Sequence, residues 1–104
     1  MIDKLKEIKK RYLNVEESLS KPEAILNMKL YTSLNKEYKN LGKIVSEYDN
    51  YLLILGGIKE AKEIISSEKD EEFRKIAKIE FETLQQKQKK IEKKLKTLLI
   101  PKDP

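Results

Sequence analysis

The sequence contains no cysteine and no histidine among its 104 residues. The lack of cysteine excludes disulfide bonds and thiol nucleophiles, and the lack of both residue types excludes the ordinary zinc sites. Histidine is the commonest general base in enzymes, so the usual acid–base chemistry is also removed. Only Asp, Glu, Lys and Tyr remain as strong catalytic candidates. We therefore expect a protein that is not an enzyme and that needs no cofactor or metal.

Long apolar runs are absent as well. The first residues, Met1–Lys6, are charged and are not followed by the continuous apolar region of a secretory signal. No stretch approaches the ~20 apolar residues that are needed to cross a bilayer. We expect no membrane association and a cytoplasmic location.

Charged residues, in contrast, are abundant. They make up 39% of the chain, well above the usual level of about 25%, which in a periodic sequence is typical of long exposed helices. The net charge is +5, and nearly all of the cationic excess after residue 70 lies in Gln85–Lys96. Such a basic patch suits RNA or an acidic partner. The alternative is a solvated face in a protein that favours Lys over Arg.

Apolar residues at steps of three and four predict a first helix over about residues 2–19. Its stripe consists of Ile2, Leu5, Ile8, Tyr12, Val15 and Leu19. The helix should end near Pro22, where Ser20 and Glu23 have the spacing of a capping box. A short helical piece over Glu23–Leu26 and a second cap at Asn27 are expected next.

A very long helix is predicted over roughly residues 28–66. Its seam, with the spacing of a coiled coil, is Leu34, Tyr38, Leu41, Val45, Tyr48, Leu52 and Leu55. A second stripe beside it is Ile44, Tyr48, Tyr51, Leu55, Ile58 and Ile65. Two stripes predict a neighbour on each side near the middle of the helix. Gly42, Gly56 and Gly57 each cost about 1 kcal/mol relative to Ala, so bends are expected there.

Asp70 is the predicted N-cap of a last helix, with Glu71 and Glu72 in its first turn. One face of this helix carries Phe73, Ala77, Phe81, Leu84, Gln88, Ile91, Leu95 and Leu98. Gln88 is a polar intrusion that is expected to help set register. Short connections imply antiparallel neighbours. The expected fold is all-α, an elongated antiparallel three-helix bundle with coiled-coil-like packing and one very long, bent middle helix.

The chain ends with "LLIPKDP". Leu98, Leu99 and Ile100 are the expected last core contacts, and the two prolines favour an extended exit. We expect residues 1–100 to form one helical domain and residues 101–104 to begin a linker to downstream domains.

Three further patterns favour structure over chemistry. Gly56-Gly57 has no preceding strand and no Lys-Ser/Thr at the spacing of a phosphate loop, which predicts a bend or a close helix contact instead. Glu80 and Glu82 lie about 200° apart on a helix and cannot converge on a metal or a substrate. The five tyrosines fall on or beside the stripes, as expected at the rim of a core.

In the basic run, we expect an outward-facing set of candidate phosphate contacts: Lys89, Lys90, Lys93 and Lys94.

Four segments carry a resemblance to a known family: "MIDKLKEIKKRY", "LSKPEAI", "NKEYKNLGKIVSEYDNY" and "LLIPKDP". In this order and spacing they resemble the N-terminal domain of the bacterial peptide chain release factor 1 family, and the resemblance covers the whole chain. The resemblance implies a factor that reads the stop codons UAA and UAG and triggers peptidyl-tRNA hydrolysis on the ribosome. The family's codon-reading loop and Gly-Gly-Gln loop map to no position of this sequence.

The resemblance further implies that this domain is a helical arm near the base of the large-subunit stalk, in contact with the class II release factor GTPase. The turn at residues 66–70 should then lie at the tip of the arm. We expect Lys62, Lys69 and Arg74 to face ribosomal or GTPase partners. Many relatives are glutamate-rich over residues 85–96, so the resemblance implies no partner for the lysines there.

Two other classes of protein fit the same pattern. One is an RNA-binding helical hairpin, such as the tRNA-gripping arm of seryl-tRNA synthetase, and the other is an oligomeric coiled-coil scaffold. Salt-dependent affinity for structured RNA would favour the first, and a stable dimer at micromolar concentration would favour the second. We expect a monomer, because the first helix can cover the second stripe within one chain.

Overall fold

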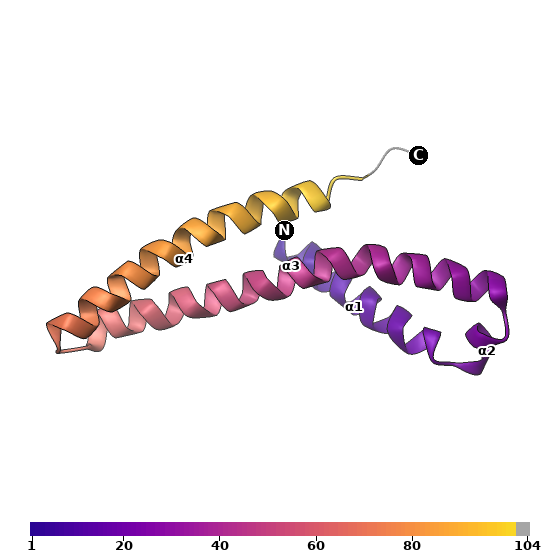
Figure 1. Ribbon diagram of the computed structural model, residues 1–104, viewed down its shortest axis with the longest axis horizontal. Helices are drawn as coiled ribbons and strands as arrows, with labels where there is room; N and C mark the ends of the chain where they lie inside the picture. The colour runs from indigo at the N-terminus through magenta and orange to yellow at the C-terminus, as the bar shows by residue number, and fades with distance from the viewer. Residues whose placement is uncertain (102–104) are drawn as a thin grey trace. The chain divides into compact units, whose positions relative to one another are not determined.

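The computed structural model describes residues 1–101, and nearly all of them are helical. Four helices follow one another along the chain: α1 (Ile2–Leu19), α2 (Pro22–Ile25), α3 (Met28–Ser67) and α4 (Glu71–Leu98) (Figure 1). No strand occurs between residues 1 and 101. The predicted all-α fold built from antiparallel helices is confirmed.

The chain divides into two units, Met1–Tyr48 and Asp49–Pro104, which are described separately. The division falls inside α3, whose 40 residues make it the longest helix, as predicted. The helix continues through Gly42, Gly56 and Gly57, none of which has a positive φ angle. The bends expected at these glycines remain a prediction.

The first unit pairs α1 with the N-terminal part of α3 in antiparallel directions, and α2 lies at their connection (Figure 1). The predicted stripe of α1 is confirmed from Leu5 onward, since Leu5 and Val15 are completely or almost completely buried, whereas Ile2 is exposed. In α3 the predicted seam also holds over this unit, where Val45 and Tyr48 are buried. Periodicity alone therefore identified both contact faces of the first unit.

The predicted capping box between Ser20 and Glu23 is wrong. Ser20 instead ends α1, where its Oγ donates a 2.7 Å hydrogen bond to the Glu17 carbonyl oxygen. Pro22 occupies the first helical position of α2, which makes Lys21 the N-cap. The second predicted cap is confirmed, because Asn27 Oδ1 accepts from the Leu30 N–H at 3.1 Å.

The second unit pairs the C-terminal part of α3 with α4 in antiparallel directions (Figure 1). Here the coiled-coil seam no longer describes α3, since Leu52 is 42% exposed. The second stripe takes over, with Tyr51 and Ile58 buried, and Ala61 joins it although the prediction omitted it. Leu52 lies one residue, or about 100° around the helix, from the buried Tyr51, so it points away from the contact face of this unit.

A close approach between α3 and α4 occurs at Gly57. A Cβ atom at this position would lie 2.9 Å from Leu84 Cδ1, whereas one at Gly56 would meet nothing within 4 Å. The close helix contact predicted for the Gly56-Gly57 pair is thus confirmed at the second glycine. The first glycine has no such packing requirement.

The N-cap prediction for α4 is confirmed, because Asp70 Oδ1 accepts from the Glu72 and Phe73 N–H groups. Its predicted inner face is also correct from Ala77 onward, where Ala77, Ile91 and Leu95 are buried. Phe73 is an exception, since its side chain is 59% exposed. It belongs to the first turn of α4, next to the connection, where α3 is ending and fewer neighbours can cover the ring.

The C-terminal end of α4 differs from the prediction at one residue. Leu98 and Leu99 are half-buried, as expected for the last core contacts, but Ile100 is 65% exposed. Leu99 already acts as the C-cap, so Ile100 has left the helix and its contact face. The predicted linker lies outside the described residues from residue 102 onward.

Candidate interaction site

The C-terminal half of α4 carries a basic face, which we define as Lys89, Lys90, Lys93 and Lys94. All four side chains are exposed, while Ile91 and Leu95 in the same stretch are buried. The predicted outward orientation of the lysines is therefore correct. At 3.6 residues per turn, the four cations fall within about one and a half turns, an arrangement that can follow a row of phosphates.

The glutamate within this basic run points into the helix pair. Glu92 Oε2 accepts a 2.7 Å hydrogen bond from the Tyr51 hydroxyl of α3 and a longer one, at 3.4 Å, from Gln88 Nε2. Burial, and then the bond to Glu92, raise the pKa of the Tyr51 phenol. The intrusion of Gln88 into the seam thus belongs to a polar cluster, and the inward turn of Glu92 leaves the outer face basic.

Sequence reasoning missed Glu92 as the partner in this cluster. The signal was present, because Gln88 and Glu92 are four residues apart and side chains at this spacing are neighbours on a helix. No role was assigned to Glu92 from the sequence. The cluster also explains how a polar residue is tolerated at a seam position, since its amide finds a hydrogen-bond acceptor.

The three cations predicted near the α3–α4 connection occupy different environments. Lys62 Nζ lies 5.8 Å from the centre of the Phe81 ring, within range of a cation–π contact. Lys69 is exposed in the connection itself. Arg74 is half-buried, and its Nε atom is enclosed without a hydrogen-bond partner in residues 1–101. Lys62 and Lys69 are accordingly exposed, whereas Arg74 is only partly accessible.

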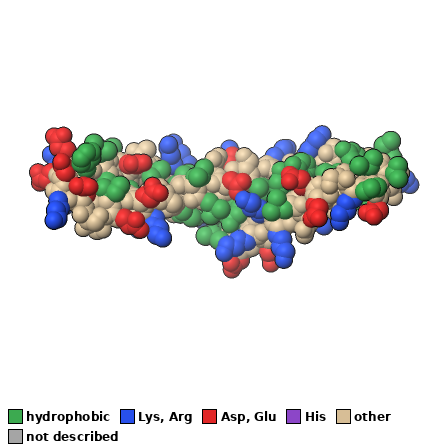
Figure 2. All heavy atoms as spheres, turned by 90° about the horizontal axis from the view of Figure 1, so that it is seen from below, with side chains coloured by type: hydrophobic (Ala, Val, Ile, Leu, Met, Phe, Trp, Pro, Cys, Tyr) green, Lys and Arg blue, Asp and Glu red, His purple; other side chains and the backbone are tan. Residues whose placement is uncertain are grey.

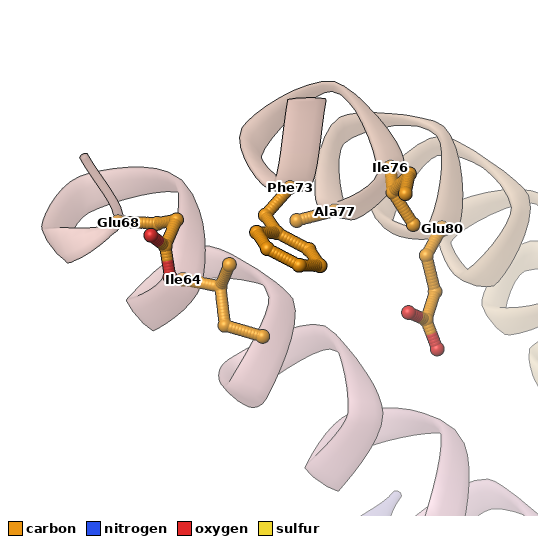
Figure 3. A pocket seen from close by; sticks show the side chains of 6 residues that line it. All are labelled: Ile64, Glu68, Phe73, Ile76, Ala77 and Glu80. Carbon is orange, nitrogen blue, oxygen red and sulfur yellow. The ribbon is translucent and has the colours of Figure 1, made fainter. Parts of the chain in front are cut away.

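A hollow of about 190 Å³ lies beside the same connection, and we call it the turn hollow (Figure 3). Its lining comprises Ile64, Glu68, Phe73, Ile76, Ala77 and Glu80. The side chains of Phe73 and Ile76 are each 59% exposed. This site was not predicted from the sequence. The available indication was Ile76, an apolar residue outside the predicted inner stripe of α4.

Polar contacts also join α1 and α3 in the first unit. Arg11 donates two hydrogen bonds to the Glu37 carboxylate, at 2.7 and 2.8 Å, which lowers the pKa of Glu37. The rings of Tyr12 and Tyr38 stack with centroids 4.7 Å apart, and their hydroxyls are 3.0 Å apart. The Tyr38 hydroxyl donates to Glu16 at 2.7 Å. Hydrogen bonds to Tyr12 and Glu16 raise the pKa of Tyr38.

The prediction that the tyrosines form the rim of the core is confirmed for Tyr12 and Tyr38, which are half-buried. Tyr48 and Tyr51 lie deeper than predicted, because both are buried in the core itself. Tyr31 is the exception, with an exposed ring in the first turns of α3. Rings that pack between helices are not available for stacking on bases.

Within residues 1–101, no group of three or more acidic side chains is placed to hold a metal ion. None of the helices in this part of the chain combines the length and apolar character needed to cross a membrane.

Comparison with known proteins identifies one family, the PCRF domain, which matches residues 8–104. The chain is 50% identical to peptide chain release factor 1 of Cytophaga hutchinsonii, 45% to that of Amoebophilus asiaticus and 40% to that of Caldicellulosiruptor bescii. Each comparison covers all of this chain but only 29% of the relative. The chain therefore spans less than a third of the length of these curated relatives. No solved structure matches it.

Proposed function

The chain belongs to the PCRF domain family, and on this premise we propose that it is the non-catalytic N-terminal helical domain of a translation termination factor. The complete factor would recognise UAA and UAG and promote peptidyl-tRNA hydrolysis on the ribosome, and would therefore act in the cytoplasm. The observation that carries the proposal is the identity of 35–50% to proteins named peptide chain release factor 1, extending over this whole chain.

A non-catalytic role is supported by the residues themselves. The sequence contains no Gly-Gly-Gln, and its three glycines all lie inside α3. The hydroxyls of Tyr38 and Tyr51 have raised pKa values, and each donates a hydrogen bond to a carboxylate between packed helices. A raised pKa makes a phenol a poorer source of phenolate at neutral pH. These groups link packed helices, which supports the proposed non-catalytic role.

We propose that the domain contacts the stalk-base region of the large ribosomal subunit and the class II release factor GTPase. Lys62, Lys69 and Arg74 remain candidate contact residues because they lie at or beside the α3–α4 connection. Among them Lys69 should contribute most, since it is exposed and has no packing role comparable to the contact of Lys62 with Phe81. Isolated residues 1–104 should be monomeric, because most of the predicted stripe positions are already covered within one chain.

Charge reversal in the complete factor tests this proposal. Lys62→Glu, Lys69→Glu and Arg74→Glu should each weaken ribosome binding or slow GTPase-dependent recycling, with Lys69→Glu the cleanest case. Lys39→Glu is the matched control, since Lys39 is an exposed lysine of α3 in the first unit. Unchanged ribosome affinity together with unchanged recycling in all three variants would count against the proposed contact surface.

A second candidate function, binding of structured RNA, is favoured by the basic face of α4. Neutralised phosphates release counterions, so the logarithm of affinity should fall with the logarithm of salt concentration by roughly one unit per contact. Lys89→Glu and Lys93→Glu should then reduce both the affinity for ribosomal RNA and this slope. An affinity unaffected by salt and by these substitutions would exclude an RNA-binding role for the basic face.

A further inference from the structure

We propose that the turn hollow is a docking site for a protein segment that presents one apolar side chain next to a lysine or arginine. This inference rests on the proposed role as an interaction domain and deepens it by naming the chemistry of a partner. It adds an electrostatic element to the proposed contacts of the cations nearby, because within the hollow itself the partner would meet the carboxylates Glu68 and Glu80.

The shape of the hollow suits a single side chain. Phe73 extends from α4 toward Ile64 of α3, with Ala77 beside it, and Ile76 lies farther along α4 (Figure 3). The volume of about 190 Å³ is comparable to the ~150 Å³ apolar cavity known to bind benzene. One aliphatic or aromatic side chain would fill such a space, whereas a whole helix would not enter it.

The surface next to the hollow is unusually apolar for a helix end. Phe73, Ile76 and Ile79 are all more than half exposed, and their spacing of three residues places them on adjoining turns of α4. Single exposed apolar residues are ordinary on soluble proteins, but a contiguous group marks an interaction site more often. Covering this group would remove apolar surface from water and favour the complex.

The charges around the hollow select the partner. The four apolar residues of the lining are joined by two carboxylates, Glu68 and Glu80. Glu68 is held in place, because its Oε1 accepts a 3.1 Å hydrogen bond from the Asp70 N–H. Residues 60–80 contain seven acidic and five basic side chains, a net charge of −2 in a chain of +5. Acidic side chains adjoin hydrophobic ones around this end of the second unit (Figure 2).

This combination favours a basic protein segment over RNA. Phosphate groups would be repelled by Glu68 and Glu80, whereas a lysine or arginine beside the apolar anchor would be attracted to them. RNA would also gain little from the exposed isoleucines, because its contacts rely on cations and on stacking platforms. The observations therefore point to one kind of occupant, a protein segment of mixed apolar and basic character.

Site-directed photo-crosslinking in the complete factor tests the proposal. Phe73→p-benzoylphenylalanine keeps the phenyl ring at the hollow and adds a photoreactive benzoyl group, on a side chain whose exposure allows the change. The factor is irradiated on stop-codon ribosomes with and without the GTPase. Digestion of the product with nuclease or protease then distinguishes an RNA adduct from a protein adduct. Leu53→p-benzoylphenylalanine is the control, since Leu53 is an exposed apolar residue of the same unit outside the hollow.

The expected product is a protein adduct at position 73 that maps to a segment with an apolar residue beside Lys or Arg. It should be absent at position 53. In the position-73 background, Glu80→Lys should lower the crosslink yield about fivefold, in line with the upper range for one exposed ion pair. Glu82→Lys, which changes an exposed carboxylate on the other side of α4, should leave the yield unchanged.

An adduct with rRNA, an adduct with a second copy of the factor, or no adduct while the factor remains ribosome-bound would each overturn the docking proposal alone. Equal effects of Glu80→Lys and Glu82→Lys would remove its electrostatic part and so contradict the basic partner. Failure of the unmodified factor to bind ribosomes would instead refute the proposed function and this inference with it. Ribosome binding, measured separately by sedimentation, distinguishes these cases.

Discussion

Alanine at each of the two adjacent glycines of α3 should have opposite consequences, although both residues lie in the same helix. Gly56→Ala removes the entropic cost of a helical glycine, which is about 1 kcal/mol, and the new Cβ meets nothing within 4 Å. The free energy of unfolding should rise by about 1 kcal/mol. For a chain of this length, that change corresponds to an increase in Tm of roughly 4–8 °C.

Gly57→Ala gains the same propensity but must accommodate Leu84. The added Cβ would lie 2.9 Å from Leu84 Cδ1, well inside the ~3.5–4.0 Å that is favourable between carbon atoms. Overpacking of a core typically costs about 1–3 kcal/mol, and the end of a flexible leucine yields at the lower part of that range. The net effect should be near zero or destabilising, which leaves Gly57→Ala about 1–3 kcal/mol below Gly56→Ala.

Urea unfolding of residues 1–104, followed by the circular dichroism of the helices, measures both changes. A double-mutant cycle with Leu84→Ala assigns the difference to this contact, because truncation of Leu84 should cost about 1 kcal/mol less in the Gly57→Ala background. Equal stabilisation by the two alanines would refute the close approach of α3 and α4. A Gly57→Ala deficit that persists unchanged without Leu84 would also contradict this explanation.

Three further changes test the caps, the core and the polar cluster, each by the free energy of unfolding. Asp70→Ala should cost about 1 kcal/mol through loss of the α4 cap, and Asp70→Asn much less; equal losses would argue against capping. Leu95→Ala, at a fully buried position, should cost about 2–5 kcal/mol, whereas Leu53→Ala on the surface should change stability by less than about 0.5 kcal/mol. Since the pKa of Tyr51 is raised on folding, its contribution to the free energy of unfolding should be present below about pH 10 and decline as the pH rises through the higher folded pKa. Tyr51→Phe should lack this decline. An identical pH profile of the variant and the original protein would contradict the raised pKa.

Local rules account for the parts of the fold that the sequence predicted correctly. Asn27 and Asp70 were identified as caps because a short polar side chain before a helix satisfies its free N–H groups without help from distant residues. Ser20 and Glu23 have the spacing of a capping box but do not form one, because Pro22 fixed the helix start one residue later. The rule for Pro therefore outweighed the rule for the capping box.

Periodicity predicted which residues face inward but not where a partner helix ends. Leu52 continues the coiled-coil pattern of α3 and is nevertheless exposed, because contact in the second unit follows the stripe through Tyr51 and Ile58. Phe73 continues the pattern of α4 and is exposed because it lies at the connection. The turn hollow arises from this same helix end, so it could not be predicted without knowing how α3 and α4 meet.

The outward orientation of the lysines at positions 89, 90, 93 and 94 was predictable, because the buried residues Ile91 and Leu95 fix the orientation of α4. The role of Glu92 was not, since its bond to Tyr51 joins residues 41 positions apart in the sequence. Charge counts from the sequence do not show which charged side chains point to the surface and which turn inward, because contacts between distant residues decide this.

Removal of residues 1–100 from the complete factor tests the central claim of a non-catalytic interaction domain most directly. The measurement compares peptide release at saturating factor with GTPase-dependent recycling on the same stop-codon ribosomes. The account predicts that single-turnover release is retained while recycling by the GTPase is lost. Loss of release at saturating factor, or recycling that proceeds as in the intact protein, would contradict it.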